Sequence, residues 1–141
     1  MNMDGTLLAF FVGILVVGVL LIIVITVTKK GPAALDVDKY RSRWLAIEQQ
    51  LKRDEPHSYQ VAVLNADKLL DQALRDRAVK GETMGERMKT LRDTWTNANA
   101  VWGAHKLRNQ IAHEPDVSVG YDDARRALAG FKQGLKDVGA I

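Results

Sequence analysis

A long uncharged stretch near the amino terminus constrains the architecture of this chain more than any other feature. No Asp, Glu, Lys or Arg occurs from Leu7 to Thr28, and most residues of the stretch are aliphatic. A helix of this length reaches about 33 Å, which exceeds the roughly 30 Å hydrocarbon core of a bilayer. Residues 7–28 are therefore predicted to form a transmembrane helix that binds the lipid bilayer, after a short extracytoplasmic tail at residues 1–6.

The charges that flank this stretch predict its orientation. The leader contains Asp4 but no Lys or Arg, unlike the basic start of a cleaved signal peptide. Basic residues follow the stretch, namely Lys29, Lys30, Lys39, Arg41 and Arg43. Because such residues stay on the cytoplasmic side, we expect a single-pass protein of the cell membrane, with its amino terminus outside and its carboxyl-terminal domain in the cytoplasm. Residues 29–35, which include Gly31 and Pro32, are expected to form a juxtamembrane linker.

The remaining residues, 36–141, are predicted to fold as a helical bundle. Few β-branched runs occur after the first thirty residues, which favours helices over strands. The chain has no cysteine, which excludes disulfides, thiolate metal sites and cysteine nucleophiles. Its net charge is only +3, and acids are interspersed among the bases, as is typical of a solvated helical surface.

Apolar residues recur at steps of three and four along five segments of this domain. The predicted helices cover residues 37–51, 56–79, 84–95, 100–113 and 124–138. The second has the widest apolar stripe and is expected to be the most buried, and Thr83 with Glu86 fits a capping box at the start of the third. In the last helix, Gly130 and Gly134 leave room for close packing. The predicted fold is all-α, with an N-terminal transmembrane helix and a four- to five-helix antiparallel bundle.

Three polar residues close the fourth predicted helix just before Pro115, which stops it. Arg108 carries a planar, permanent cation that suits phosphate, and His113 can gain or lose a proton near neutral pH. Asn109 and His113 are four residues apart, so they share a helix face. The segment therefore combines an anion-binding group with a proton-transfer group.

An arginine, a polar residue, three further residues and a histidine, late in a helical bundle, resemble the signature of the HEPN superfamily (higher eukaryotes and prokaryotes nucleotide-binding domain). Arg108, Asn109 and His113 carry the resemblance. It implies a bundle of four or five helices that forms a homodimer in which two copies of the motif face each other. Many members are metal-independent ribonucleases, and toxin–antitoxin arrangements in the superfamily imply an inhibitory partner protein.

Under this hypothesis the chain is an endoribonuclease or an RNA-binding module. His113 would act as general base on an RNA 2′-hydroxyl, and Arg108 would stabilise the pentavalent transition state, giving a 2′,3′-cyclic phosphate and a 5′-hydroxyl. Asn109 would orient His113 or contact phosphate, and His105, one turn earlier, is a candidate accessory residue. The scheme needs no cofactor or metal, and no convincing ligand cluster occurs in the sequence.

Other interpretations of these residues remain open. Basic residues favour the last turn of a helix, where His113 meets free carbonyls and the negative end of the dipole. The domain would then be a noncatalytic, membrane-tethered protein-interaction (scaffold) domain. Five basic residues form either an RNA-facing patch or a solvated surface: Arg87, Lys89, Arg92, Lys106 and Arg108. The tryptophans Trp44, Trp95 and Trp102 are expected in the core or at a dimer interface. Trp102 lies beside the apolar stripe of its helix and is a candidate for the dimer contact.

Overall fold

The computed structural model describes residues 3–28 and 33–141, and these residues form six α-helices and no strand. Their contacts divide the chain into two units, one containing the first helix and the other containing residues 33–141. The predicted linker at residues 29–35 lies largely outside the described residues.

The first helix, α1 (Met3–Thr28), is long and apolar enough to cross a membrane. Within its stretch from Gly5 to Thr28, an 18-residue segment has a mean hydropathy of 3.4, and none of that segment is buried against protein. The helix begins four residues before the predicted position Leu7 and ends at the predicted residue Thr28. A helix with apolar side chains on every face, all exposed, is stable where lipid takes the place of water.

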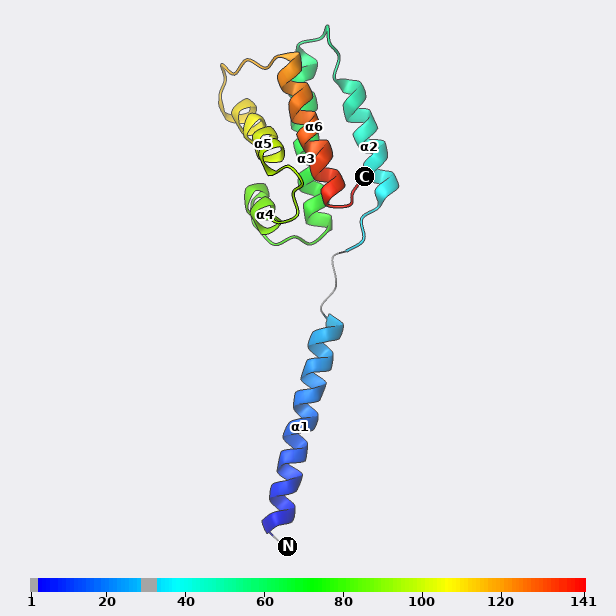
Figure 1. The fold of residues 1–141 in the computed structure, drawn as a ribbon, viewed down its shortest axis with the longest axis vertical. Helices are drawn as coiled ribbons and strands as arrows, with labels where there is room; N and C mark the ends of the chain where they lie inside the picture. Colours follow the sequence, from blue (N-terminus) through cyan, green and yellow to red (C-terminus); the bar gives the residue numbers. More distant parts are fainter. Residues whose placement is uncertain (1–2, 29–32) are drawn as a thin grey trace. The chain divides into compact units, whose positions relative to one another are not determined.

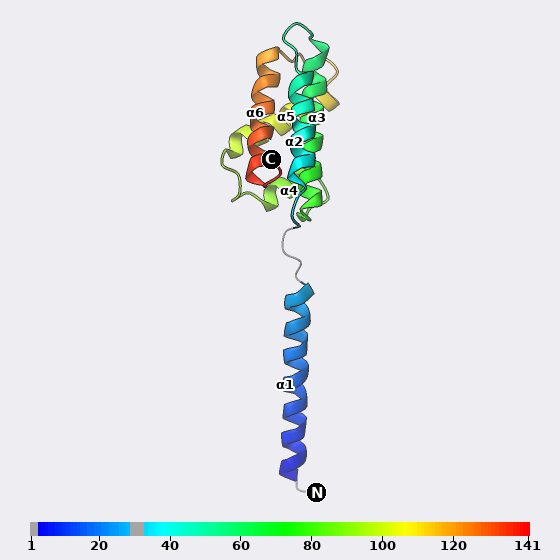
Figure 2. The same ribbon diagram turned by 90° about the vertical axis from the view of Figure 1, so that its right-hand side faces the viewer.

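The second unit contains five helices: α2 (Val37–Gln50), α3 (His57–Asp76), α4 (Met84–Thr90), α5 (Ala98–His113) and α6 (Tyr121–Asp137). Helix α3 packs against each of the other four and contributes the largest set of buried residues, as its wide apolar stripe predicted. Figures 1 and 2 show α3 and α6 side by side and running in the same direction, while α2 runs the opposite way. Helices α2 and α3 are therefore antiparallel. Helices α3 and α6 are parallel, because the chain returns through α5 to the end of the bundle where α3 begins before it enters α6.

Side chains and backbone groups define the helix ends. The Asp36 carboxylate accepts a hydrogen bond from the Lys39 amide at the start of α2, and Asn97 caps α5 in the same way through the Ala100 amide. At α4, Thr83 and Glu86 form the predicted capping box. These bonds satisfy amide groups that the first turn of a helix leaves unpaired.

Two helices, α3 and α4, end at least three residues earlier than predicted. Helix α3 stops at Asp76 instead of Val79, because Ala78 adopts a left-handed conformation (φ 57°) and the Val79 amide bonds back to the Leu74 carbonyl. This closes a Schellman motif, here with alanine where glycine is usual. Helix α4 stops at Thr90, so Trp95 belongs to the turn that follows, where its indole N–H donates to the Met88 carbonyl (3.0 Å).

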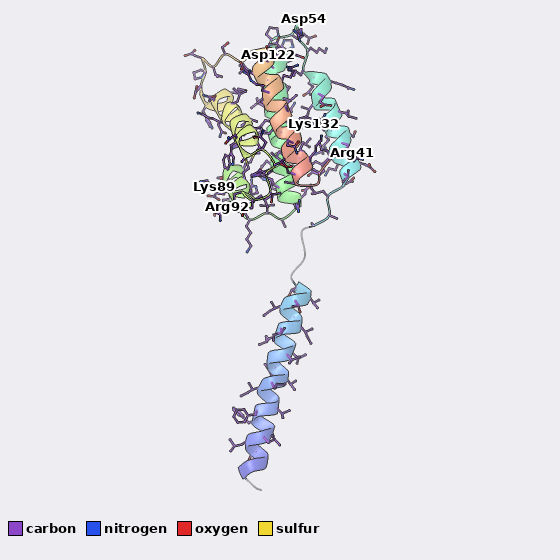
Figure 3. All side chains as sticks on the ribbon, viewed as in Figure 1. Arg41, Asp54, Lys89, Arg92, Asp122 and Lys132 are labelled. Atoms are coloured by element: carbon purple, nitrogen blue, oxygen red, sulfur yellow. The ribbon has the colours of Figure 1, made fainter. Side chains whose placement is uncertain are left out.

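The core of the second unit includes Trp44, Trp95 and Phe131, which confirms the prediction for both tryptophans. A Cβ atom added at Gly130 would lie 2.6 Å from the Ala100 carbonyl oxygen, and one at Gly134 would lie 3.1 Å from a Val101 methyl. Both glycines therefore permit close packing of α6, as predicted, and the structure shows that α6 packs there against α5. Near Lys132, labelled in Figure 3, α6 also reaches α2 through an ion pair with Glu48 (2.6 Å).

Candidate functional site

Helix α5 ends at His113, as predicted, because Glu114 is extended and Pro115 follows. His105, Asn109 and His113 occur at four-residue steps, so they form a strip along one face of α5. We call these three residues the polar strip. Exposure increases along it, from a half-buried His105 and Asn109 to an exposed His113.

Asp67 of α3 joins two residues of α5 to each other. Its Oδ1 atom lies 2.7 Å from Nδ1 of His105, and its Oδ2 atom lies 3.1 Å from Nε of Arg108. Arg108 donates from Nη1 to Oδ1 of Asn109 (2.9 Å), and Nδ2 of Asn109 lies 3.3 Å from Nε2 of His105. The four side chains therefore form a closed ring of polar contacts, which holds Arg108 in one position.

The donor and acceptor properties of these groups fix the direction of each bond. A guanidinium can only donate, so the amide oxygen of Asn109 accepts from Arg108 and its NH₂ group faces His105. The Nε2 atom of His105 must then accept, so its hydrogen lies on Nδ1 and is donated to the Asp67 carboxylate. Every member of the ring is satisfied, which is the condition for a half-buried polar network to be stable.

The ring borders a hollow of 1160 Å³ between α3, α4 and α5. Asp67, His105, Arg108 and Asn109 all contribute to its lining. Six basic and four acidic side chains line the hollow, so its wall carries a net positive charge. The hollow is therefore a polar surface suited to anions, with an anchored guanidinium in its wall.

His113 lies apart from this arrangement in one copy of the chain. It does not line the hollow, and within residues 33–141 its side chain has no hydrogen bond or ion pair. The structure thus brings together Arg108, Asn109 and the accessory candidate His105, and leaves His113 accessible at the helix end. Asn109 faces His105 and Arg108, so its predicted contact with His113 is not made in the single copy.

The five basic residues considered as a patch have different environments. Arg87 contributes to the lining of the hollow but is only 5% exposed and donates to Asp71 from Nε (3.1 Å) and Nη2 (2.6 Å), so it is a structural residue. Lys89, Lys106 and Arg108 line the hollow, whereas Arg92 does not. Figure 3 shows Lys89 and Arg92 at the end of the bundle opposite Asp54 and Asp122.

Asp67 is the site residue that the sequence analysis missed. It occurs at the spacing of Val63, Leu70 and Leu74, which are all buried, and is itself only 3% exposed. An acid on the apolar stripe of a helix must be paired, because burying an unpaired charge is costly. The sequence therefore indicated that Asp67 has a partner. It could not identify His105 and Arg108 as the partners, since they lie 38 and 41 residues away on α5.

The described residues contain no group of three or more His, Asp or Glu side chains placed to bind a metal ion. No protein-family model, curated protein or solved structure matches this chain. The site geometry and the sequence motif are therefore the basis for any functional proposal.

Proposed function

We propose that the chain is a membrane-anchored, HEPN-like protein that binds RNA and, as a homodimer, cleaves it without a metal ion. The observation that carries the proposal is the pairing, on one helix, of an arginine anchored by a buried carboxylate with an exposed histidine that has no partner in the described bundle. Phosphoryl transfer needs a fixed cation near the reacting phosphate and a base that is free to take a proton.

Arg108 supports the role of the cation. Its Nε and Nη1 atoms are held by Asp67 and Asn109, and its side chain is 36% exposed, so the guanidinium is both fixed and accessible. The five N–H donors of a guanidinium allow it to keep these two bonds while it donates to a phosphate oxygen. Stabilisation by a group that is already in position costs no reorganisation during the reaction.

His113 supports the role of the base. In the proposed reaction it takes the proton of a 2′-hydroxyl, O2′ attacks the adjacent phosphorus, and the bond from phosphorus to O5′ breaks. The protonated His113 of the partner copy supplies the proton that the leaving 5′-oxygen gains. The products are a 2′,3′-cyclic phosphate and a 5′-hydroxyl, so the step needs neither a metal nor an external nucleophile.

The test is RNA cleavage by the full-length chain, purified in detergent and assayed in excess chelator, with analysis of the product ends. We expect cyclic phosphate ends and a loss of about 100-fold or more in rate for Arg108→Ala and for His113→Ala. His57→Ala is the matched histidine control, since His57 is exposed at the start of α3 and does not line the hollow. Arg125→Ala, on the exposed face of α6, is the arginine control.

Dimerisation is tested in the same preparation. We expect the rate per chain to fall on dilution, and an excess of His113→Ala chains to lower the wild-type rate, because a mixed dimer lacks one of the two histidines that transfer protons. If either variant cleaves RNA at the wild-type rate, the role assigned to the substituted residue is contradicted.

Orientation in the membrane is a further part of the proposal. The basic residues that follow α1 favour a cytoplasmic bundle. The absence of cysteine allows single cysteines to be introduced without background, at Asn2 and at the exposed Arg125. In intact cells an impermeant maleimide should label Asn2→Cys and not Arg125→Cys, and the reverse pattern would refute this orientation.

A noncatalytic scaffold is the second candidate. It is favoured by Leu45 and Val61, which are 56% and 45% exposed and are the large hydrophobic side chains exposed within residues 33–141. Exposed apolar groups of this size mark protein contacts when they gather in a patch. A folded wild-type chain that cleaves no RNA, but whose self-association is lost in Leu45→Lys/Val61→Lys, would favour this function.

A further inference from the structure

Three lysines surround the hollow, each from a different helix. Lys68 belongs to α3, Lys89 to α4 and Lys106 to α5, and all three line the hollow and are exposed. Within residues 33–141 none of them forms an ion pair or hydrogen bond through its side chain. Ammonium groups that converge on one concavity from three helices create a local positive potential that attracts anions.

Two of the four acids of the same wall are paired with cations. Asp67 is bound by Arg108 and His105, and Asp71 by Arg75 (2.9 Å) and Arg87 (2.6 Å). The Glu86 carboxylate accepts from the Glu82 and Thr83 amides, and these backbone bonds hold its pKa below the usual value. Among the described lining residues, the Glu82 and Glu86 carboxylates oppose the three lysines, so the balance of these groups is positive.

An aromatic side chain completes the wall. Trp102 is half-buried and lines the hollow, with its ring edge-on to His105 at a centroid distance of 6.3 Å. A Cβ atom at Gly85 would lie 4.0 Å from Cζ3 of Trp102, so this edge of the indole packs against the start of α4. The contacts on two sides hold the ring in position, as is required of a platform on which a nucleobase stacks.

We infer that this hollow is the docking site for a single-stranded RNA segment next to the cleaved bond. The phosphates lie among Lys68, Lys89 and Lys106, and one unpaired base stacks on Trp102. The inference rests on the proposed function, and it adds that the RNA binds in the hollow and does so as a single strand. The hollow is larger than most pockets for small molecules, which are about 300–1,000 Å³, and it leads to Asn109, about 6 Å along the helix axis from His113.

The chemistry distinguishes this site from one for duplex RNA. A base is available for stacking only where it is unpaired, and aromatic stacking is tolerant of base identity. The hollow is therefore expected to select single strands over duplexes while showing little preference among sequences. The three lysines contribute a salt-dependent attraction that is independent of sequence.

The test measures binding separately from cleavage. The full-length chain in detergent is titrated into a fluorescein-labelled, fully 2′-O-methylated single strand, which cannot be cleaved because it lacks the attacking hydroxyl. The test variant is Lys68→Ala/Lys89→Ala/Lys106→Ala. The control variant, Arg41→Ala/Arg125→Ala/Lys136→Ala, removes the same charge from exposed residues that do not line the hollow.

We expect the test variant to bind at least 10-fold more weakly than the control at moderate salt. The slope of log affinity against log salt should fall by about 2 in the test variant, because each lost phosphate contact to a single strand accounts for about 0.7. Trp102→Ala should weaken binding roughly 5- to 150-fold, and Trp102→Phe should restore most of the loss. The phenylalanine variant separates loss of stacking from any loss of structure.

Each outcome has a defined meaning. If the wild type cleaves and binds RNA, but the test and control variants bind equally, the docking site is refuted and the proposed function stands. If the wild type neither binds nor cleaves RNA, both proposals fail. If the hollow lysines are needed only for binding vesicles with anionic lipids, and RNA binding is unchanged, the hollow is a lipid site and the inference is overturned.

Discussion

Asp67 of α3 and Arg108 of α5 form an ion pair with 3.1 Å between Oδ2 and Nε, and the aspartate side chain is only 5% exposed. The pair joins two helices that are far apart in the sequence. Since the second carboxylate oxygen accepts from His105, one buried charge positions two residues of the proposed site. The orientation of the Arg108 side chain therefore depends on the Asp67 carboxylate as well as on its position in α5.

Asp67 is therefore expected to act as a positioning residue. In Asp67→Asn one amide hydrogen would face a donor, either Arg108 Nε or His105 Nδ1, so the ring would open. We expect RNA cleavage to fall by about 10- to 100-fold, and Asp67→Asn/Arg108→Ala to be no slower than Arg108→Ala alone. Initial rates in a double-mutant cycle measure this coupling, with the exposed Asp93→Asn as the control. Independent, additive losses would show that Asp67 does not act through Arg108.

Arg87 is predicted to stabilise the fold and to take no part in RNA binding. It donates to Asp71 and, from Nη1, to the carbonyls of Gly81 (2.7 Å) and Glu82 (3.2 Å), so it fixes the connection between α3 and α4. Arg87→Ala should lower the free energy of unfolding by about 3–5 kcal/mol, because it leaves a partly buried carboxylate without its main partner. Urea denaturation measures the change, and the exposed Arg92→Ala should stay within about 0.5 kcal/mol of the wild type.

Two helical glycines should respond in opposite directions to alanine. Gly130→Ala places a methyl group against the Ala100 carbonyl oxygen, so we expect a loss of about 1–3 kcal/mol in thermal or urea unfolding. Gly103 has no atom within 4 Å of the position that its Cβ would occupy. Gly103→Ala should therefore gain about 0.5–1 kcal/mol, because alanine loses less backbone entropy in a helix. Equal effects at the two positions would contradict the close approach of α6 to α5.

Acid should destabilise the bundle partly through Asp137. Burial raises the pKa of this carboxyl, but the Thr96 hydroxyl (2.6 Å), Gln133 and the Thr96 amide together hold the pKa below its usual value of 3.8. A lowered pKa in the folded state means that this contribution to stability is present above pH 3.8 and is lost as the pH falls through the folded-state value.

Comparison of urea unfolding at neutral pH and near pH 3 measures the acid effect. Asp137→Asn should be less stable than the wild type at neutral pH, and the difference should shrink in acid. A difference between the two proteins that does not change with pH would show that the charge of Asp137 makes no contribution.

The sequence predicted most of the helices because each depends on local information. Periodic apolar residues located α2, α3, α5 and α6, and the pair Thr83 and Glu86 located the start of α4. The errors were at helix ends. Propensity alone did not indicate that Ala78 would adopt a left-handed conformation, because the Val79 amide bond that favours it is a property of the folded turn.

The candidate site was only partly predictable. The spacing of Arg108, Asn109 and His113 along one helix follows from the sequence, but the ring that holds Arg108 depends on Asp67, which tertiary packing brings to α5. Trp102 and the three lysines of the hollow likewise come together only because α3, α4 and α5 meet. Helix periodicity gives no information about contacts between helices.

The contact between Gly130 and Ala100 also has a mechanical consequence. Ala100 lies in the first turn of α5, where the Gly130 Cα approaches its backbone too closely for any side chain between them. His113 is at the other end, about 20 Å away. Helix α5 is thus held at its beginning by this close backbone approach and near Arg108 by the Asp67 carboxylate. Of the residues proposed to act at a dimer contact, the exposed His113 therefore has the most freedom to adjust, whereas Arg108 keeps the position that Asp67 gives it.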